Sequence, residues 1–291
     1  MAVPSAAQTD FWPRPLEPED NQSTPAKISL GARLFSDPRL SSTGDFSCAS
    51  CHDPDLHFTD GRITAIGATG ETHTRNTPTL YNVAFHSSYG WDDQGLSTLE
   101  AQHLVPLTNT TPVEMGFAQS NLQKLREDPS YRAAFGTAFG ATQITLHKVV
   151  QALASYVRSI RAPQSAFDRY LFFDDASALS PAAMAGMELF FSPRLGCGEC
   201  HASINFSGPI SHSVTTSEPV FHVTRVGGKS SAFRAPTLRM IAHTAPYMHD
   251  GSLVDLEAVL VHYENSDAER VPDFSLSAAE RRALIAFLQA L

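Results

Sequence analysis

All four cysteines of this 291-residue chain occur in two short motifs of the form Cys-x-x-Cys-His. Cys-Ala-Ser-Cys-His occupies residues 48–52, and Cys-Gly-Glu-Cys-His occupies residues 197–201. Two thiols three residues apart can form thioether bonds to the edge of a porphyrin, and the imidazole that follows can reach the iron. The spacing therefore predicts two covalent c-type haems. The attachment residues would be Cys48, Cys51, Cys197 and Cys200, with His52 and His201 as axial ligands of the first and second iron.

The cysteine pairs have two other interpretations. Four cysteines in two pairs are a common ligand set for structural zinc, and a Cys-x-x-Cys pair can also be a redox dithiol. Neither explains a histidine at the same place after both pairs, so we favour haem attachment. Because haem c is attached outside the cytoplasm, we expect a periplasmic protein. We also expect that Met1-Ala2 replaces a removed signal peptide, since no charged and then apolar leader is present.

The two haem motifs lie within longer matching segments. Residues 30–40 and 185–195 both carry Leu-Phe and Pro-Arg-Leu ahead of the motif. Further along, Pro-Thr-Leu at 78–80 and at 236–238 is followed in each case by Leu-Glu-Ala, at 99–101 and at 256–258. The shared order and the shared relation to each haem motif indicate an internal duplication.

Each half ends in a segment with helical periodicity. Residues 145–160 place apolar side chains near every third or fourth position, with Thr145 as the N-cap. In residues 277–291, Ser277 and Glu280 form a Ser-x-x-Glu capping box ahead of an apolar stripe. Strand signals are sparse, and the best candidate is 220–226. We therefore predict a mainly α fold of two cytochrome c-like helical domains from an internal duplication, each carrying one covalent haem c.

The expected domain organisation has three parts. Residues 1–26, rich in proline and acidic residues, form an extended arm on the surface, in which Trp12 serves packing. Residues 27–163 form the first haem domain and residues 164–291 the second haem domain. A formal net charge of −9 argues against nucleic acid as a partner, and no apolar run is long enough to span a membrane.

The residue on the far side of each iron decides what the haem does. A second protein ligand gives an electron-transfer haem, and an open position gives a reactive one. Five residues beyond Ala258 lies Tyr263, whereas five residues beyond Ala101 lies Pro106. A tyrosinate can bind iron and a proline side chain cannot, so the two haems are predicted to differ. Spacing alone leaves other ligands open for the second iron, namely His262, Met240, Met248 and His249.

Over nearly its whole length the chain resembles the bacterial di-haem cytochrome c peroxidase superfamily. The resemblance rests on Leu-Phe-x-Asp-Pro-Arg-Leu at 34–40, Arg-Asn-Thr-Pro-Thr-Leu at 75–80, Pro-Val-Glu-Met-Gly at 112–116, Ala-Pro-Thr-Leu at 235–238 and Thr-Ala-Pro-Tyr-Met-His-Asp-Gly at 244–251. Ordinary members close the first iron with a histidine in an Ile-Gly-His context and the second with a methionine.

This sequence departs from the ordinary pattern at both places. It has Ile-Gly-Ala at 66–68 and His-Tyr at 262–263. Both departures are similar to the MauG branch, which implies a five-coordinate first haem and Tyr263 on the second iron. His73, five residues beyond Ala68, is a further candidate for the first iron, and its other interpretation is an ordinary loop histidine. Residues 58–61 and 67–75 look most like MbnH-type enzymes, which oxidise a tryptophan of a small partner protein.

The resemblance also implies roles for individual residues. Glu114 would be a distal carboxylate that moves a proton of peroxide, Gln102 a distal amide, Pro106 a wall of the pocket and Trp91 an electron carrier between the haems. Their other interpretations are a solvated loop acid for Glu114, a helix-surface amide for Gln102 and core packing for Trp91. A calcium ion would be held by oxygen atoms of Asn76, Thr244 and Pro246.

We therefore expect an oxidoreductase that uses hydrogen peroxide, through a high-valent state of the two haems, to oxidise a Trp or Tyr of a partner protein by long-range electron transfer. A small periplasmic copper-binding protein is one candidate partner. The alternative is a cytochrome c peroxidase that reduces hydrogen peroxide to water with electrons from a small redox protein. A third possibility is a non-catalytic electron carrier, which an open first iron would exclude.

Overall fold

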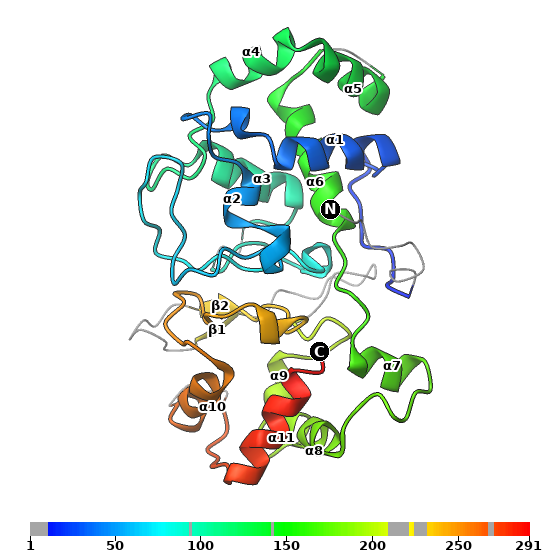
Figure 1. Cartoon of the computed structure of the whole chain (residues 1–291), viewed down its shortest axis with the longest axis vertical. Coiled ribbons are helices and arrows are strands. Elements are labelled where there is room, and N and C mark those ends of the chain that lie inside the picture. The colour runs from blue at the N-terminus through cyan, green and yellow to red at the C-terminus, as the bar shows by residue number, and fades with distance from the viewer. Residues whose placement is uncertain (1–10, 93–94, 141–142, 209–220, 224–231, 267–270) are drawn as a thin grey trace. The chain divides into compact units, whose positions relative to one another are not determined.

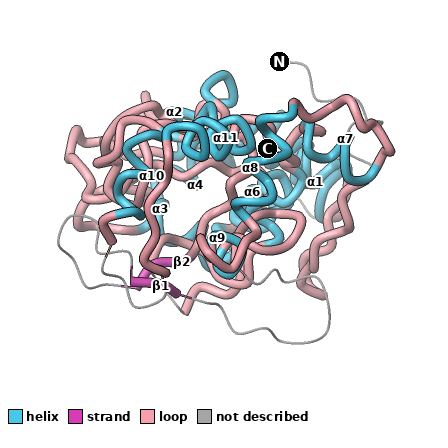
Figure 2. Tube along the Cα trace, turned by 90° about the horizontal axis from the view of Figure 1, so that it is seen from below, coloured by secondary structure: helices cyan, strands magenta, loops and turns pink. Residues whose placement is uncertain are grey.

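The computed structural model of the chain describes residues 11–92, 95–140, 143–208, 221–223, 232–266 and 271–291. These residues are mainly helices and loops, and the strands that they contain form one short antiparallel pair (Figures 1 and 2). They divide into two compact units. The first unit consists of residues 15–84 and 88–160, and the second of residues up to Arg14, residues 85–87 and residues 161–291. The prediction of a mainly helical fold is confirmed.

The first unit contains the first Cys-x-x-Cys-His motif. Its α-helices are α1 (Pro25–Phe35), α2 (Cys48–Cys51), α3 (Leu99–Thr108), α4 (Gln119–Glu127), α5 (Pro129–Phe139) and α6 (Leu146–Ser159). Short 3-10 turns are η2 (Pro38–Leu40), η3 (Pro54–Leu56) and η4 (Val83–Phe85), the last of which ends in the second unit. The loops between α2 and α3 are long, and they carry several of the residues that the sequence marks as functional.

The second unit contains the second motif. Its helices are α7 (Ala166–Phe172), α8 (Pro181–Phe190), α9 (Cys197–Cys200), α10 (Leu256–Glu264) and α11 (Ala278–Leu288), with a 3-10 turn η6 (Ile241–His243). Strands β1 (Phe221–Val223) and β2 (Ala232–Arg234) pair with Phe221 opposite Arg234. Of the strand predicted at 220–226, residues 221–223 form β1, and positions 220 and 224–226 lie outside the described residues.

One helix pair forms the centre of each unit, and the two pairs are built alike. In the first unit α1 packs on α6 so closely that a Cβ on Gly31 would lie 2.0 Å from the carbonyl oxygen of Ala152. In the second unit α8 packs on α11, and a Cβ on Gly186 would lie 1.9 Å from the carbonyl oxygen of Ala283. Only glycine permits this approach. Gly31 and Gly186 occupy matching positions in the repeated segments 30–40 and 185–195.

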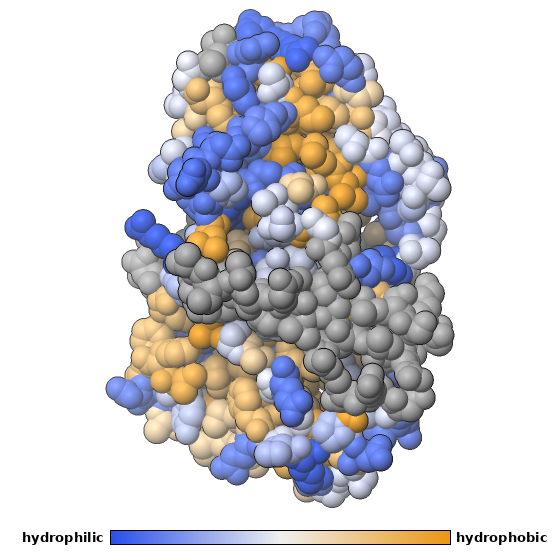
Figure 3. Space-filling view, turned by 180° about the vertical axis from the view of Figure 1, so that it is seen from behind, coloured by the Kyte–Doolittle hydropathy of each residue, from blue (hydrophilic) through white to orange (hydrophobic). Residues whose placement is uncertain are grey.

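The caps predicted from the sequence are present. Thr145 accepts a hydrogen bond from the backbone N–H of Lys148 at the start of α6. Ser277 and Glu280 form both hydrogen bonds of a capping box at the start of α11. On the outside of the first unit, α4 buries Leu122 and Leu125, while the surface over α4 and α5 is mostly hydrophilic (Figure 3). The apolar stripe of a helix thus marks the side that packs inward.

The described part of the N-terminal arm is mostly exposed or half-buried, and Trp12, which was predicted to serve packing, is one of its two buried residues. Trp12 is only 6% exposed, and its Nε1–H donates to the carbonyl oxygen of Ala162 at 3.0 Å. Asn21 is fully buried, and its amide donates to the carbonyl oxygen of Gln151 at 3.0 Å. Burial of the Trp12 ring stabilises this arrangement, and the hydrogen bonds of the indole N–H and of the Asn21 amide satisfy the polar groups that become buried. Among the described residues no helix is long and apolar enough to cross a membrane.

Candidate haem sites

The first motif forms α2, a helix of one turn. Cys48 and Cys51 are three residues apart, so their side chains share one face. Burial raises the pKa of both thiols to about 12, with Coulombic repulsion from Glu114 adding to the rise. Burial likewise raises the pKa of Cys197 in the second motif to about 11. A redox dithiol needs the opposite shift, because the thiolate is its reactive form. The raised pKa values of Cys48, Cys51 and Cys197 therefore do not favour the dithiol interpretation.

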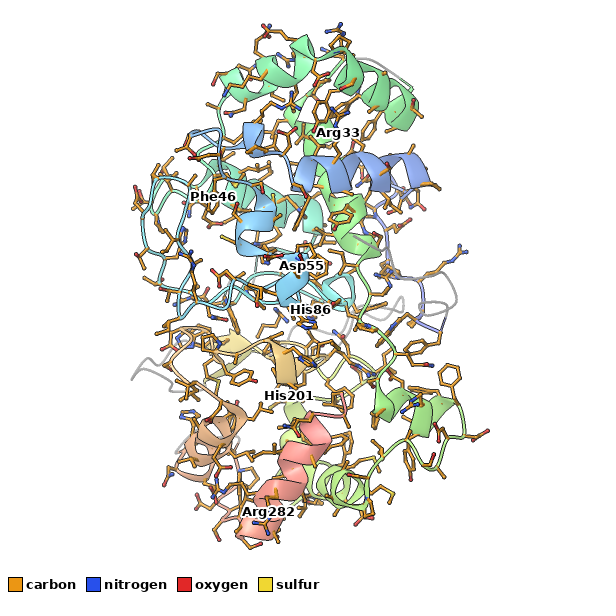
Figure 4. All side chains as sticks on the ribbon, in the orientation of Figure 1. Arg33, Phe46, Asp55, His86, His201 and Arg282 are labelled. Atoms are coloured by element: carbon orange, nitrogen blue, oxygen red, sulfur yellow. The ribbon has the colours of Figure 1, made fainter. Side chains whose placement is uncertain are left out.

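The two motif histidines are oriented in the same way. His52 Nδ1 lies 3.0 Å from the carbonyl oxygen of Phe58, and His201 Nδ1 lies 2.8 Å from that of Phe206. Phe58 and Phe206 both have left-handed backbones, with φ of 61° and 49°. An imidazole that donates from Nδ1 to a carbonyl presents Nε2 to a metal. His201 lies directly after α9 (Figure 4).

The residues present fit a covalently attached haem in each unit. Burial lowers the pKa of His52, opposed by its hydrogen bond with Phe58, and so favours the neutral imidazole that binds iron. All four cysteines are free of disulfides. The two pairs belong to different compact units, and within the described ranges no three His, Cys, Asp or Glu side chains are grouped to hold a bare metal ion. The zinc interpretation therefore finds no support in these residues.

Helix α3 brings the three predicted residues of the peroxide pocket together. Gln102 and Pro106 lie four residues apart on α3, on one face. The backbone N–H of Met115 donates to the carbonyl oxygen of Pro106 at 3.0 Å, which ties the segment carrying Glu114 to this helix. Gln102 Oε1 is buried and has no hydrogen-bond partner in the described part of the protein. A buried acceptor of this kind suits a bound group with an O–H donor.

Glu114 lies beside the first motif. Its negative charge raises the pKa of both Cys48 and Cys51. Burial raises the pKa of Glu114 itself, whereas the charge of His73 and a hydrogen bond from Asn109 act to lower it. The Glu114 side chain is 32% exposed, and its Oε1 lies 4.0 Å from His73 Nδ1. The interpretation as a solvated loop acid is therefore a poor fit, and His73 is a member of this site that the sequence left ambiguous.

Trp91 and Asn76 are joined in the first unit. The indole N–H of Trp91 donates to the carbonyl oxygen of Asn76 at 2.9 Å. Asn76 is buried, and its Nδ2 donates to the carbonyl oxygens of Arg62 at 2.8 Å and Ile63 at 3.2 Å. These bonds fix the amide, with Oδ1 as the oxygen that a hard cation would use.

The other two residues predicted for calcium, Thr244 and Pro246, belong to the second unit. Thr244 is buried, and its hydroxyl donates to the carbonyl oxygen of Ile241 at 3.3 Å. Since the three residues belong to different units, the calcium site stays a prediction.

Tyr263 faces the second motif. Burial raises its pKa to about 12, and the charges of Cys200 and Cys197 add to the rise, which places the phenol near both attachment cysteines. A phenol with so high a pKa ionises when a cation such as ferric iron binds its oxygen. Neighbouring residues on a helix point in directions about 100° apart, so His262 and Tyr263 cannot both point at one iron.

The other candidate ligands of the second iron have different surroundings. His249 is buried, and its ring stacks on Phe233 with 3.8 Å between the ring centroids. Met240 and Met248 both have left-handed backbones, with φ of 60° and 73°. The electrostatic influence of the attachment cysteines on Tyr263 therefore favours this residue, as the resemblance implied.

The fold and the sites together define a helical protein with two c-type haem sites that differ in the residues predicted opposite the motif histidine. The profile of the family described as di-haem cytochrome c peroxidase matches residues 25–176. The methylamine utilization protein MauG of Methylorubrum extorquens is 36% identical over 288 residues, which cover 94% of this chain and 80% of that protein. The cytochrome c551 peroxidase of Nitrosomonas europaea is 32% identical over 238 residues, 78% of this chain and 70% of that protein.

The solved structures that are similar along almost the whole chain include one at 32% sequence identity. It is a crystal structure of a MauG-like protein associated with microbial copper homeostasis, with a TM-score of 0.89 and 32% identity, covering 97% of this chain and 93% of that one. The chain belongs to the di-haem cytochrome c peroxidase family, in its MauG-like branch. It is an oxidoreductase with two haem c groups, and the predicted family is confirmed.

Proposed function

We propose that the protein uses hydrogen peroxide at the first haem to oxidise a Trp or Tyr of a partner protein, with the second haem relaying the oxidising equivalents. The proposal rests on one observation: the helices α3 and α10 occupy equivalent places in the two halves but carry different residues at the position predicted to face the haem site. In α10 the phenol of Tyr263 faces Cys197 and Cys200, whereas α3 has Pro106 at the matching place. A haem bound by Cys48, Cys51 and His52 would supply the iron at which peroxide is cleaved, and the phenol of Tyr263 would favour oxidised states of the second haem.

The residues around the first haem have separate tasks. Pro106 offers no side-chain ligand and leaves room for a small oxidant. The buried Oε1 of Gln102 accepts a hydrogen bond from the bound peroxide. Glu114, tied to α3 through the bond between Met115 and Pro106, takes a proton from one peroxide oxygen and returns it to the other. The half-buried Trp91 is the candidate to carry charge between the haems, because indole is readily oxidised.

The remaining finer assignments are part of the same proposal. Asn76, Thr244 and Pro246 hold a calcium ion through oxygen atoms, supported by the fixed amide of Asn76. The protein works in the periplasm, where haem c is attached. The partner is a protein that docks on the second domain, because a folded molecule cannot enter a pocket closed by Gln102 and Glu114. A copper-binding protein is the first candidate, since the structural neighbour of 32% identity is associated with copper homeostasis.

The test is to incubate the diferric holoprotein with hydrogen peroxide and purified candidate partners encoded by neighbouring genes, and to map modified residues by mass spectrometry. We expect a Trp or Tyr of one partner to be oxidised, and we expect the Tyr263→Phe variant, with normal haem content, to lose this activity. Modification that persists in Tyr263→Phe would contradict the role of the tyrosine.

The alternative is a peroxidase that reduces hydrogen peroxide to water with electrons from a small redox protein. It is supported by the 32% identity with a cytochrome c551 peroxidase. The same experiment separates the two functions. Rapid turnover of peroxide with a small cytochrome or copper protein as donor, without any lasting modification of a partner, would favour the peroxidase.

A further inference from the structure

Residues 85–87 come from the first half of the sequence but belong to the second unit. The ring of Phe85 is fully buried, with 6.0 Å between its centroid and that of the Trp12 ring. The guanidinium carbon of Arg161 lies 5.1 Å from the same centroid. Trp12 and Arg161 are both residues of the second unit. These contacts hold the next residue, His86, in that unit, and Figure 4 labels it.

His86 is a buried histidine whose two ring nitrogens are unpartnered. The residue is only 4% exposed. Neither Nδ1 nor Nε2 has a hydrogen-bond partner in the part of the chain that the structure describes. An imidazole carries at least one N–H whatever its charge, and a buried N–H without an acceptor is costly. We therefore expect a bound group with an acceptor atom at this place.

Arg234, the last residue of β2, brings a positive charge to His86. Burial lowers the pKa of His86 well below its usual value, and the charge of Arg234 lowers it further, which places the guanidinium near the imidazole. Arg234 is itself 8% exposed, and its Nη1 donates to the carbonyl oxygen of Ala235 at 3.2 Å. A buried N–H donor beside a guanidinium suits an anion, whether or not the imidazole is protonated.

The segment that follows β2 is joined to the loop that orients His201. Three residues after Arg234, the hydroxyl of Thr237 donates to the carbonyl oxygen of Asn205 at 2.7 Å. Asn205 precedes Phe206, whose carbonyl oxygen is 2.8 Å from His201 Nδ1. Arg234 thus stands in a segment that is fixed to the second haem motif. The anionic groups that a haem brings to such a site are its propionate carboxylates.

The internal repeat gives an independent reason to expect an anion here. Identical residues keep one register through this stretch, namely Pro-Thr-Leu at 78–80 and 236–238, Ala84 and Ala242, and Tyr89 and Tyr247. In this register Arg234 corresponds to Asn76, and His86 corresponds to Thr244. Asn76 and Thr244 are proposed to offer oxygen atoms to calcium, whereas their counterparts offer N–H donors and a positive charge. The same positions of the repeat are thus suited to ions of opposite sign.

We propose that His86 and Arg234 form a binding site for a carboxylate, and that this carboxylate is a propionate of the second haem. The imidazole N–H donates a hydrogen bond to a carboxylate oxygen, and the guanidinium balances the negative charge. No proton is transferred, since even neutral imidazole has an N–H to donate. The comparison with Asn76 and Thr244 rests on the proposed calcium site, whereas the binding of a carboxylate depends on neither calcium nor peroxide.

The test uses the haem-loaded protein, resonance Raman spectra of the propionate bending bands and spectroelectrochemical titration of both haems. His86→Phe removes both ring nitrogens, and His86→Gln keeps an N–H donor. In His86→Phe one propionate band should shift and the potential of the second haem should fall, because a less compensated negative charge favours ferric iron. His86→Gln should recover part of both changes. His147→Phe, on the exposed side of α6, is the control and should match the wild type.

A carboxylate from solution is the alternative source, and calorimetric titration with sodium acetate at constant ionic strength distinguishes the two. Acetate that binds to the wild type and roughly 10-fold or more weakly to His86→Phe, with unchanged Raman bands, would show a carboxylate site and rule out the propionate. Unchanged bands and potentials, with no difference in acetate binding, would overturn the proposal altogether, since a water molecule would then satisfy His86. If His86→Phe does not bind haem normally, Arg234→Gln at normal haem content should show the same fall in potential, and an unchanged potential would equally overturn the proposal.

Discussion

Asp168→Asn should destabilise the second unit and disturb the second haem. Asp168 and Arg239 form an ion pair with 2.8 Å between Oδ1 and Nη1, and both side chains are fully buried. Burial lowers the pKa of Arg239 and the charge of Asp168 opposes that shift, so the carboxylate stabilises the buried guanidinium. Removing one partner of a buried pair typically costs roughly 3–5 kcal/mol. For a domain of about 150 residues this corresponds to a fall in Tm of roughly 6–20 °C.

The effect should reach the haem because Arg239 also supports the loop that orients His201. Its Nε donates to the carbonyl oxygen of Ile204 at 2.8 Å. Ile204 lies between His201 and Phe206, whose carbonyl oxygen is 2.8 Å from His201 Nδ1. We therefore expect the low-spin electron paramagnetic resonance signal of the second haem to shift or broaden in Asp168→Asn, while the signal of the first haem stays the same.

Differential scanning calorimetry of the haem-loaded protein measures the Tm, and Asp175→Asn is the matched control. Asp175 pairs with Arg169 at 3.7 Å, but both side chains are substantially exposed, at 34% and 51%, so its loss should change the Tm little. The double variant Asp168→Asn with Arg239→Met should be more stable than Asp168→Asn alone, because the unpaired charge is removed. A Tm of Asp168→Asn equal to that of the control would refute the reasoning.

Three further outcomes are expected at the haems. The oxidised protein should give one high-spin and one low-spin haem signal, because Pro106 offers no ligand and Tyr263 does; two low-spin signals would contradict this. Tyr263→His should keep a six-coordinate second haem and abolish partner oxidation, as neutral imidazole stabilises oxidised iron less than phenolate does; unchanged oxidation would show the tyrosine to be dispensable. Glu114→Gln should slow the stopped-flow reaction with peroxide by roughly 10²–10⁴-fold at normal haem content. Since burial raises the pKa of Glu114, the wild-type rate should fall as the pH drops through a midpoint above 4.5, and a midpoint at or below that value would contradict the buried-base assignment.

The features that the sequence predicted well are local or repeated. Thr145 and Ser277 could be assigned as caps because a capping bond joins residues only three positions apart. The two haem motifs could be recognised because thioether attachment and axial ligation need a fixed spacing. The duplication could be recognised because both copies keep the residues that their shared structure requires. Gly31 and Gly186, for example, make the same close contact between two helices in the two units.

The features that the sequence could not predict depend on contacts between distant segments. Trp12 was predicted to serve packing, but its partner could not be predicted, because its indole N–H donates to the carbonyl oxygen of Ala162, 150 positions away. His73 lies near Glu114 because backbone hydrogen bonds join the segment of residues 65–75 to the loop that carries Glu114. Neither segment has a sequence pattern that predicts this proximity. The hydrogen bond between His52 and the carbonyl oxygen of Phe58 could not be predicted for a similar reason, since it depends on the left-handed backbone of Phe58 in an irregular turn.

The two haem sites differ although equivalent helices, α3 and α10, contribute to them. Helices α3 and α10 both begin with a side-chain cap, in which Thr98 and Asp255 accept the backbone N–H three residues on, at 3.1 Å and 2.7 Å. Eight residues after each cap lie Pro106 and Tyr263, so the start of the helix sets where both of them stand relative to their unit. If Tyr263 binds the second iron as proposed, this single position is enough to open one iron and close the other, because proline offers no ligand atom and tyrosine a phenol oxygen. The duplicated scaffold can therefore stay constant while the chemistry of the two halves diverges.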